Sequence, residues 1–457
     1  MIVRFVRNIE NEMSASRLNS VRSLCCADYL LWLFCVFLLV GCSTAYEKTA
    51  TSSWDELARG NSKEVVKKYE DEVKEPRDRL LKLMDEGVAL RVGGEFKASN
   101  EKFFAADKIL EQAGYTSITE ETASVLLNER LKVYQGEDFE KVIVHLYLAL
   151  NFLSLKDLPA ALIETRRVNE ILYQMISKSK RPYQLNAFAQ YLGGSIYEQS
   201  REWNDAYIAY RSAFETAGKP RWDFLGRDLI RNALRLGFSQ EVEEWTIFFG
   251  ADTYRAAYDE WKQKEASVIL FFEAGKSPMK VSSREKHFKK DKEGGLIEVL
   301  IPISTYQART SSVNGARLCL KRLEKGSAEA CSASVTLFDV ESTAITHLKD
   351  RMGRQVAKAL LSAGVKSGVA VGLGKATDSQ ALGLLTGLLL FAASEADTRS
   401  WLLLPKSFQV ARLSLNAGEY AARVEFLAGS QKIEERDLGK LRLKPGAIQE
   451  FQARSFR

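Results

Sequence analysis

Side chains that carry enzyme chemistry are scarce in this sequence. Its 457 residues include only three histidines, His145, His287 and His347, and no two of them have the spacing of metal ligands. No serine lies in a Gly-x-Ser-x-Gly elbow. The stretch 274–277 (Ala-Gly-Lys-Ser) does not complete a phosphate-binding loop, because Leu270 stands where the first glycine belongs. We therefore expect no catalytic residues, no metal and no cofactor, in a protein that is not an enzyme.

Strong charge and long apolar runs are also missing. The net charge of +6 is too small to argue for nucleic acid as a partner. The most apolar run, residues 29–40, is shorter than the ~20 residues that span a bilayer. A run of this length behind several arginines is typical of a signal peptide, with Met1 or Met13 as its start.

The apolar run ends in Leu39-Val40-Gly41-Cys42, which resembles the lipobox of bacterial lipoproteins. The resemblance implies that residues 1–41 are removed and that Cys42 receives lipid. Several acyl chains, at ~0.8 kcal/mol per buried methylene, hold a protein on a membrane permanently. Because Ser43 follows the cysteine, the resemblance implies the periplasmic face of the outer membrane.

Few cysteines remain after this processing. Of six, three precede Cys42 and Cys42 itself is lipidated, which leaves Cys319 and Cys331. They lie on either side of an expected turn at 324–327, in a compartment that permits disulfides. The sequence leaves open whether they form a disulfide or remain two buried thiols.

Helical patterning extends over 63–264, after an expected flexible tether at 42–62. Within it, small and aromatic residues recur at the offsets of tetratricopeptide (TPR) repeats, in which small residues let two helices cross closely. The alternative is an unrelated helical bundle that uses the same packing. The clearest matches are Gly87, Gly94, Phe96, Phe103 and Ala106, and then Gly194, Tyr197, Trp203, Ala206, Tyr210 and Ala213.

Residues 265–457 are rich in β-type runs. The fold class is therefore α+β: an N-terminal TPR-like α-solenoid followed by a β-rich domain, which a Gly/Ala-rich helical hairpin interrupts at about 346–394. We expect a charged loop at 284–295. Expected strands cover 267–272, 296–303, 317–322, 331–338, 408–413, 420–427 and 436–443.

Glycines in the helical insertion recur every fourth residue. Such a stripe lets another helix approach closely, in lipid or in water. The positions are Gly364, Gly368, Gly372, Gly383 and Gly387.

Two further groups of residues are candidates for interaction. Charged and aromatic residues of the repeats would line a TPR groove and bind a partner, or simply form a solvated helix face. Asp397, Arg399 and Trp401 would fix the insertion to the β-domain by an ion pair and a stacked guanidinium. The partner-binding candidates are Glu164, Arg166, Arg167, Tyr197 and Trp203.

Residues 134–140, 160–167 and 396–401 resemble a family of bacterial TPR-like outer-membrane lipoproteins, and the resemblance covers nearly all of the mature chain. It implies an envelope location and no particular activity. The leading hypothesis is a lipid-anchored periplasmic scaffold or adaptor that recruits an envelope protein through its TPR groove. The alternative is a self-assembling, membrane-associated homo-oligomer that uses the glycine-striped helices 364–387.

Overall fold

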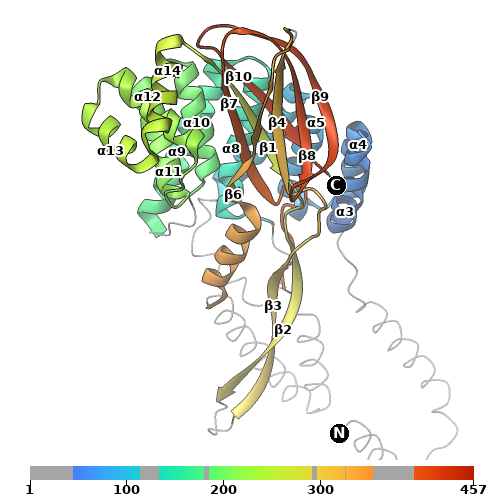
Figure 1. Ribbon diagram of the computed structural model, residues 1–457. Coiled ribbons are helices and arrows are strands. Elements are labelled where there is room, and N and C mark those ends of the chain that lie inside the picture. Colours follow the sequence, from blue (N-terminus) through green and yellow to red (C-terminus); the bar gives the residue numbers. More distant parts are fainter. Residues whose placement is uncertain are drawn as a thin grey trace, which may run out of the picture.

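The computed structural model describes residues 45–113, 133–179, 185–290, 296–324, 326–353 and 396–456. Cys42 and the glycine stripe lie outside these ranges. Helices fill the first half and strands the second (Figure 1). The helices are α3 (Ala45–Ala58), α4 (Ser62–Glu72), the 3₁₀ helix η1 (Pro76–Asp78), α5 (Arg79–Val92), α6 (Phe96–Ala113), α8 (Asp138–Ser154), α9 (Leu158–Ser179), α10 (Ala187–Gln199), α11 (Trp203–Thr216), α12 (Asp223–Leu236), α13 (Ser239–Phe249) and α14 (Ala251–Gln263).

Consecutive helices pack as hairpins: α5 with α6, α8 with α9, α10 with α11 and α12 with α13. A Cβ atom on Gly87 would lie 2.8 Å from the ring of Phe103, and one on Gly194 would lie 2.6 Å from the ring of Tyr210. Glycine is thus required where the two helices of a hairpin cross. The small-and-aromatic spacing predicted from the sequence is confirmed, and the helical half is a TPR-like array.

The expected flexible tether at 42–62 is wrong, because helix α3 occupies most of it. Tyr46, Ala50, Trp54 and Leu57 recur with helical spacing and are all buried. Serine and threonine residues between them dilute the apolar pattern, which is why the sequence reads as a polar linker.

The strands form two four-stranded sheets and a separate hairpin. The inner sheet has the order β10-β1-β7-β6 and the outer sheet the order β5-β4-β8-β9. Strand β1 pairs parallel with β10 and antiparallel with β7. The strands are β1 (Ala266–Ala274), β2 (Met279–Lys290), β3 (Leu296–Gln307), β4 (Gly315–Arg322), β5 (Glu329–Ala333), β6 (Val335–Asp339), β7 (Ser407–Leu415), β8 (Gly418–Ala428), β9 (Gln431–Leu443) and β10 (Ile448–Arg454).

The inner sheet is the middle of three layers (Figure 1). Successive residues of β1 point to opposite faces. Val268, Leu270 and Phe272 pack in an apolar core with the outer sheet. Ile269 and Phe271 pack on the other face, against the helices.

Strands β2 and β3 form a long hairpin that projects from one end of the body (Figure 1). The expected charged loop at 284–295 is therefore wrong in its first part. Residues 284–290 pair with the apolar strand β3, so a partner strand outweighs their polar character. The expected helical insertion begins earlier than predicted, at residue 340, and is described to residue 353. Within the described ranges, no helix is long and apolar enough to cross a bilayer.

Candidate interaction surface

The inner face of the helical array is covered by the chain's own inner sheet. The Phe188 ring of α10 lies 5.5 Å from the ring of Phe271 and 5.1 Å from that of Phe408. Tyr147 of α8 lies 5.9 Å from Phe408. Helix α8 is mostly apolar and is buried around nearly its whole circumference, so it has cover on every side. The expectation that the inner helices line an open groove is therefore wrong for this face.

Three of the predicted partner-binding residues, Glu164, Arg166 and Arg167, lie on α9, the second helix of its hairpin. Arg166 is exposed, and its Nη2 lies 2.8 Å from Oε1 of Glu202. Arg167 pairs with Glu111. Their assignment to a groove-lining inner helix is wrong, whereas a role in binding stays a prediction.

The two predicted aromatic residues lie between neighbouring helices, Tyr197 of α10 against α9 and Trp203 of α11 against α12. The hydroxyl of Tyr197 accepts a hydrogen bond from Nδ2 of Asn169, at 3.1 Å, and the side chain is buried. The ring of Trp203 lies 4.6 Å below the guanidinium of Arg235. Both residues therefore fix neighbouring helices to one another.

Helix α9 presents an exposed surface, which we call the α9 stripe. Its members recur every three or four residues and so share one helix face. Ile163 is 63% exposed and Tyr173 is 77% exposed. The α9 stripe consists of Ile163, Arg166, Arg167, Glu170 and Tyr173.

A buried histidine supports α9 from beneath. Nδ1 of His145 lies 2.8 Å from Oε2 of Glu164, and Nε2 lies 3.1 Å from Oδ1 of Asp107. Burial lowers the pKa of His145, but hydrogen bonds with the two carboxylates outweigh it and raise the pKa to about 9. His145 is thus a structural cation between α6, α8 and α9, with neither ring nitrogen left for catalysis.

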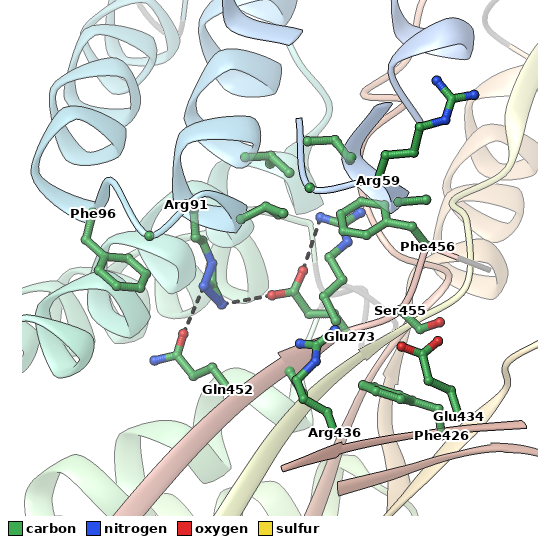
Figure 2. Close-up of a pocket in the computed structure, with 18 residues that line it drawn as sticks. Arg59, Arg91, Phe96, Glu273, Phe426, Glu434, Arg436, Gln452, Ser455 and Phe456 are labelled. Carbon is green, nitrogen blue, oxygen red and sulfur yellow. Dashed lines mark hydrogen bonds and ion pairs between the residues drawn. The ribbon is translucent and has the colours of Figure 1, made fainter. Parts of the chain in front are cut away.

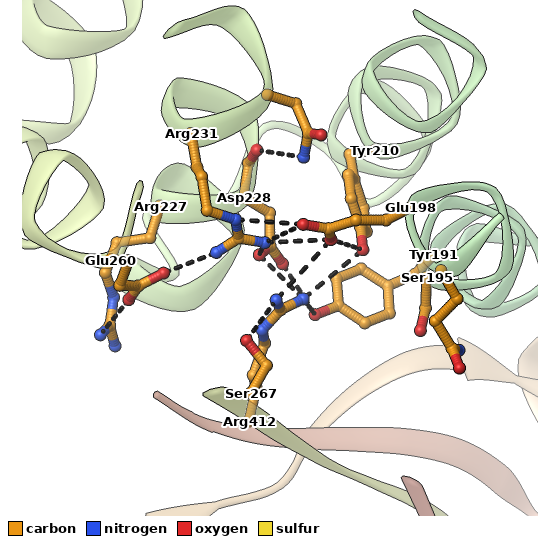
Figure 3. A network of polar contacts seen from close by, with 12 residues as sticks. Tyr191, Ser195, Glu198, Tyr210, Arg227, Asp228, Arg231, Glu260, Ser267 and Arg412 are labelled. Atoms are coloured by element: carbon orange, nitrogen blue, oxygen red, sulfur yellow. Dashed lines mark hydrogen bonds and ion pairs between the residues drawn. The ribbon is translucent and has the colours of Figure 1, made fainter. Parts of the chain in front are cut away.

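A charged network joins α10, α12 and α14 to strand β7 (Figure 3). Nη1 of Arg412 lies 2.8 Å from Oδ1 of Asp228, and Nε of Arg231 lies 3.1 Å from Oε1 of Glu198. Nη1 of Arg231 also lies 2.5 Å from Oε2 of Glu260. Burial raises the pKa of Glu198, but the arginines around it outweigh burial and hold that pKa well below its usual range.

One residue in the sequence indicates that a buried charged network exists. Arg412 is the only charged residue of the run 408–413 and is buried. A buried arginine in such a place requires an acidic partner. Its partners lie about 200 residues away in sequence, on helix faces that read as solvated.

Asp397, Arg399 and Trp401 belong to an irregular buried segment, the strap (396–406), that leads into β7. Nε of Arg399 lies 2.8 Å from Oδ1 of Asp397, and Nη1 lies 3.1 Å from Oδ1 of Asp78. The Trp401 ring lies 5.9 Å from that of Tyr147 on α8. The strap is thus fixed to the helices. It also contacts the β-domain, because Ser304 of β3 donates to the carbonyl of Asp397 and Ser277 donates to that of Trp401.

Three side chains that sequence reasoning missed bind the backbone of the strap at residues 400–403. Tyr46 donates to one carbonyl and accepts from one amide, while Asp85 and Glu140 each accept from an amide. Burial raises the pKa of both carboxyl groups to about 7. These contacts supply hydrogen-bond partners to the backbone groups of a buried segment that has no secondary structure of its own.

Cys319 and Cys331 face each other across β4 and β5 and are joined by a disulfide. Among the residues that the structure describes, only Cys319, Glu329 and Cys331 approach metal-ligand spacing. Both sulfur atoms are already bonded to one another, so this group offers no thiolate to a metal.

No protein-family model matches this chain, and no curated protein matches its sequence. Solved structures with similar helices include MamA 41-end from Desulfovibrio magneticus RS-1, 14% identical, which covers 49% of this chain and 98% of its own with a TM-score of 0.30. A Podosopora anserina putative kinesin light chain with TPR-like repeats is 14% identical over 47% of this chain and 95% of its own, with a TM-score of 0.30. Aspartyl phosphate phosphatase F from Bacillus subtilis is 14% identical over 48% of this chain and 53% of its own, with a TM-score of 0.32. Likeness at this level carries no information on activity.

Proposed function

We propose that this chain is a lipid-anchored, non-enzymatic scaffold on the periplasmic face of the outer membrane, where it recruits an envelope protein. Helix α3 begins at Ala45, three residues after Cys42. Three extended residues reach about 10 Å. A lipid on Cys42 would therefore hold the folded body against the bilayer, because α3 is itself packed into the core.

The elements at this end of the body, the anchor end, are held together by polar contacts. Near the first turn of α3, Thr398 Oγ1 donates to Glu47 Oε1 at 2.7 Å. Close by, Ser304 of β3 donates to the Asp397 carbonyl at 2.6 Å. Tethering at Cys42 would thus turn the β2–β3 hairpin toward the membrane (Figure 1).

A second set of contacts holds helix 340–353 and the hairpin to α8. Oε1 of Glu137, at the N-cap of α8, lies 2.5 Å from Nζ of Lys280 on β2. Its other oxygen lies 3.0 Å from Nη1 of Arg351. Buried charge pairs of this kind fix orientation, which supports a rigid scaffold over a loosely tethered domain.

The α9 stripe is the surface we assign to the partner. It lies on the outer helical layer, and the inner face is already covered. Its exposed Ile163 and Tyr173 flank two arginines, which suits a protein surface with an apolar centre and an acidic rim.

Crosslinking in cells tests the recruitment. A discrete adduct is expected with the wild-type chain, and its yield should fall at least about tenfold when Ile163→Asp and Tyr173→Asp are combined. Ile247→Asp is the matched control, because Ile247 is also 77% exposed but lies on α13. Equal adduct yields in all three chains would refute the α9 stripe as the partner surface.

Fractionation tests the anchor. Cys42→Ala should move the protein from the membrane fraction to the soluble periplasmic fraction, and mass spectrometry of the wild-type chain should find acylation at Cys42. A Cys42→Ala chain that stays with the outer membrane would contradict the proposal.

The direction of the hairpin favours one alternative, a self-assembling membrane-associated protein that uses the glycine stripe. In that case Gly368→Leu should change both the assembly size and the extraction of the protein from membranes. Wild-type behaviour of that variant would exclude this alternative.

A further inference from the structure

A pocket of about 540 Å³ lies between the end of α3, the α5–α6 turn, β9 and the chain segment after β10 (Figure 2). Its wall has an apolar part that includes Val88, Phe96 and Phe456. The volume is in the range of small-molecule sites, about 300–1,000 Å³. The charged residues that line it are Arg59, Arg91, Arg436, Arg454, Glu273 and Glu434, so arginines outnumber glutamates by four to two.

Two guanidinium groups share one carboxylate at the base of the pocket. Nη2 of Arg91 lies 2.8 Å from Oε1 of Glu273, and Nη1 of Arg454 lies 3.3 Å from Oε2 of the same residue. The hydroxyl of Tyr147 also donates to Glu273, at 2.9 Å. The single carboxylate of Glu273 thus pairs with two guanidinium groups and also accepts a hydrogen bond from a hydroxyl.

These guanidinium groups are buried and only partly satisfied. Arg91 is 9% exposed and Arg454 is 8% exposed. Within the described ranges, Nε of both residues lacks a hydrogen-bond acceptor. The Figure 3 network has a different charge balance, since its buried arginines Arg412 and Arg231 are met by three carboxylates, those of Asp228, Glu198 and Glu260, although Nε of Arg412 likewise has no acceptor among the described residues.

Further cations gather beside the pocket, around Trp54. The guanidinium of Arg454 lies 5.2 Å from the Trp54 ring, that of Arg309 5.2 Å and the ammonium of Lys276 5.4 Å. Burial, together with the charge of Arg454, lowers the pKa of Arg309 to about 10. Positive charge is in local excess, and an anion would be attracted to it.

We propose that this pocket binds a soluble small molecule through a phosphate or carboxylate group. Arginine is well suited to both groups, and the apolar wall would cover an uncharged part of the ligand. The pocket lies at the C-terminal end of α3, about 20 Å along the helix from the anchor end. This distance favours a soluble ligand over a lipid headgroup in the bilayer to which Cys42 would be tethered.

Calorimetric titration of the mature chain with inorganic phosphate and with succinate, at constant ionic strength in chloride, tests the proposal. We expect saturable binding of at least one of them. Arg436→Gln should weaken it about tenfold, and Glu434→Gln should tighten it a few-fold, because the two changes alter the charge of the pocket in opposite directions. Both positions are on β9, where substitution leaves the core intact. Arg255→Gln, at an exposed arginine of α14 far from any proposed site, is the control and should bind as the wild type does.

Three outcomes would overturn the proposal. The first is that neither anion binds at about 10 mM, a concentration above typical metabolite affinities. The second is that the three variants bind with equal affinity. The third is that the chain binds only to phosphatidylglycerol vesicles. The proposal does not depend on the partner surface, because Arg436 and the α9 stripe are separate and the crosslinking assay reports only on the latter.

Discussion

The two faces of the inner sheet are built on different principles, although the same strands supply both. Toward the outer sheet, β1 presents Val268, Leu270 and Phe272 to an apolar core. Toward the helices it presents Ile269 and Phe271, with Ser267 and Glu273 bonded to arginines at either end. The buried residues of the first face are apolar or, like Gln409 of β7, uncharged, whereas the other face combines an apolar centre with buried charge.

The difference indicates a division of roles between the two faces. Apolar burial is non-directional and stabilises association without fixing one geometry. Buried ion pairs add little net stability but are costly to break, so they penalise every misaligned arrangement. We infer that the outer sheet supplies stability, whereas the charged residues orient the helical array on the inner sheet.

Arg412→Met gives the largest test of this contrast. It leaves Asp228 and Glu198 short of a buried partner, so the free energy of unfolding should fall by about 3–5 kcal/mol in chemical denaturation. Adding Asp228→Asn to the same chain should recover part of the loss. Arg166→Met, at an exposed pair, should cost less than about 1 kcal/mol. If Arg412→Met also lowered the free energy of unfolding by less than about 1 kcal/mol, the charged network would not be needed to hold the helices on the inner sheet.

Leu270→Ala probes the apolar face and should cost about 3–4 kcal/mol through lost burial and a cavity. The two costs should differ in their pH dependence. Asp228 and Glu198 keep Arg231 as a partner in Arg412→Met but lose one positive charge, which favours their protonation in acid, so the cost of that variant should shrink between pH 7 and pH 5. The cost of Leu270→Ala should stay constant, and a parallel decrease in both would contradict the division.

The sequence predicted the apolar side of this contrast better than the charged side. The run 267–272 indicated a buried strand because a strand that is covered on both faces is apolar at nearly every position. Asp228, Glu198 and Arg412 come from three distant segments, so no local pattern reports that they meet. Helix α3 escaped detection because its four core residues are embedded among serine and threonine. Periodicity thus predicted the helical hairpins and the strands, whereas the polar contacts between distant segments could be identified only from the three-dimensional structure.

A substitution of His145 tests whether a buried charge also stabilises the fold within the helical half. Its folded-state pKa of about 9 lies above the ordinary 6.5. Stability from the imidazolium is therefore fully present below pH 6.5 and is lost as pH rises through 9, by about 3 kcal/mol in all. His145→Gln should flatten the free energy of unfolding between pH 7 and pH 9.5. An unchanged slope would mean that Asp107 and Glu164 do not hold the proton.

Gly194→Ala gives the smallest effect and connects the repeat packing to the charged network. The new methyl group would lie 2.6 Å from the Tyr210 ring, whose hydroxyl donates to Glu198 at 2.9 Å. The ring therefore cannot move away without disturbing the network, and the free energy of unfolding should fall by about 1–2 kcal/mol. Gly353→Ala is the matched control, because none of the described residues lies within 4 Å of the added carbon and alanine favours a helix by up to about 1 kcal/mol. If Gly194→Ala were also harmless, the helices of the α10–α11 hairpin would have room to separate, and the network above them could not depend on their spacing.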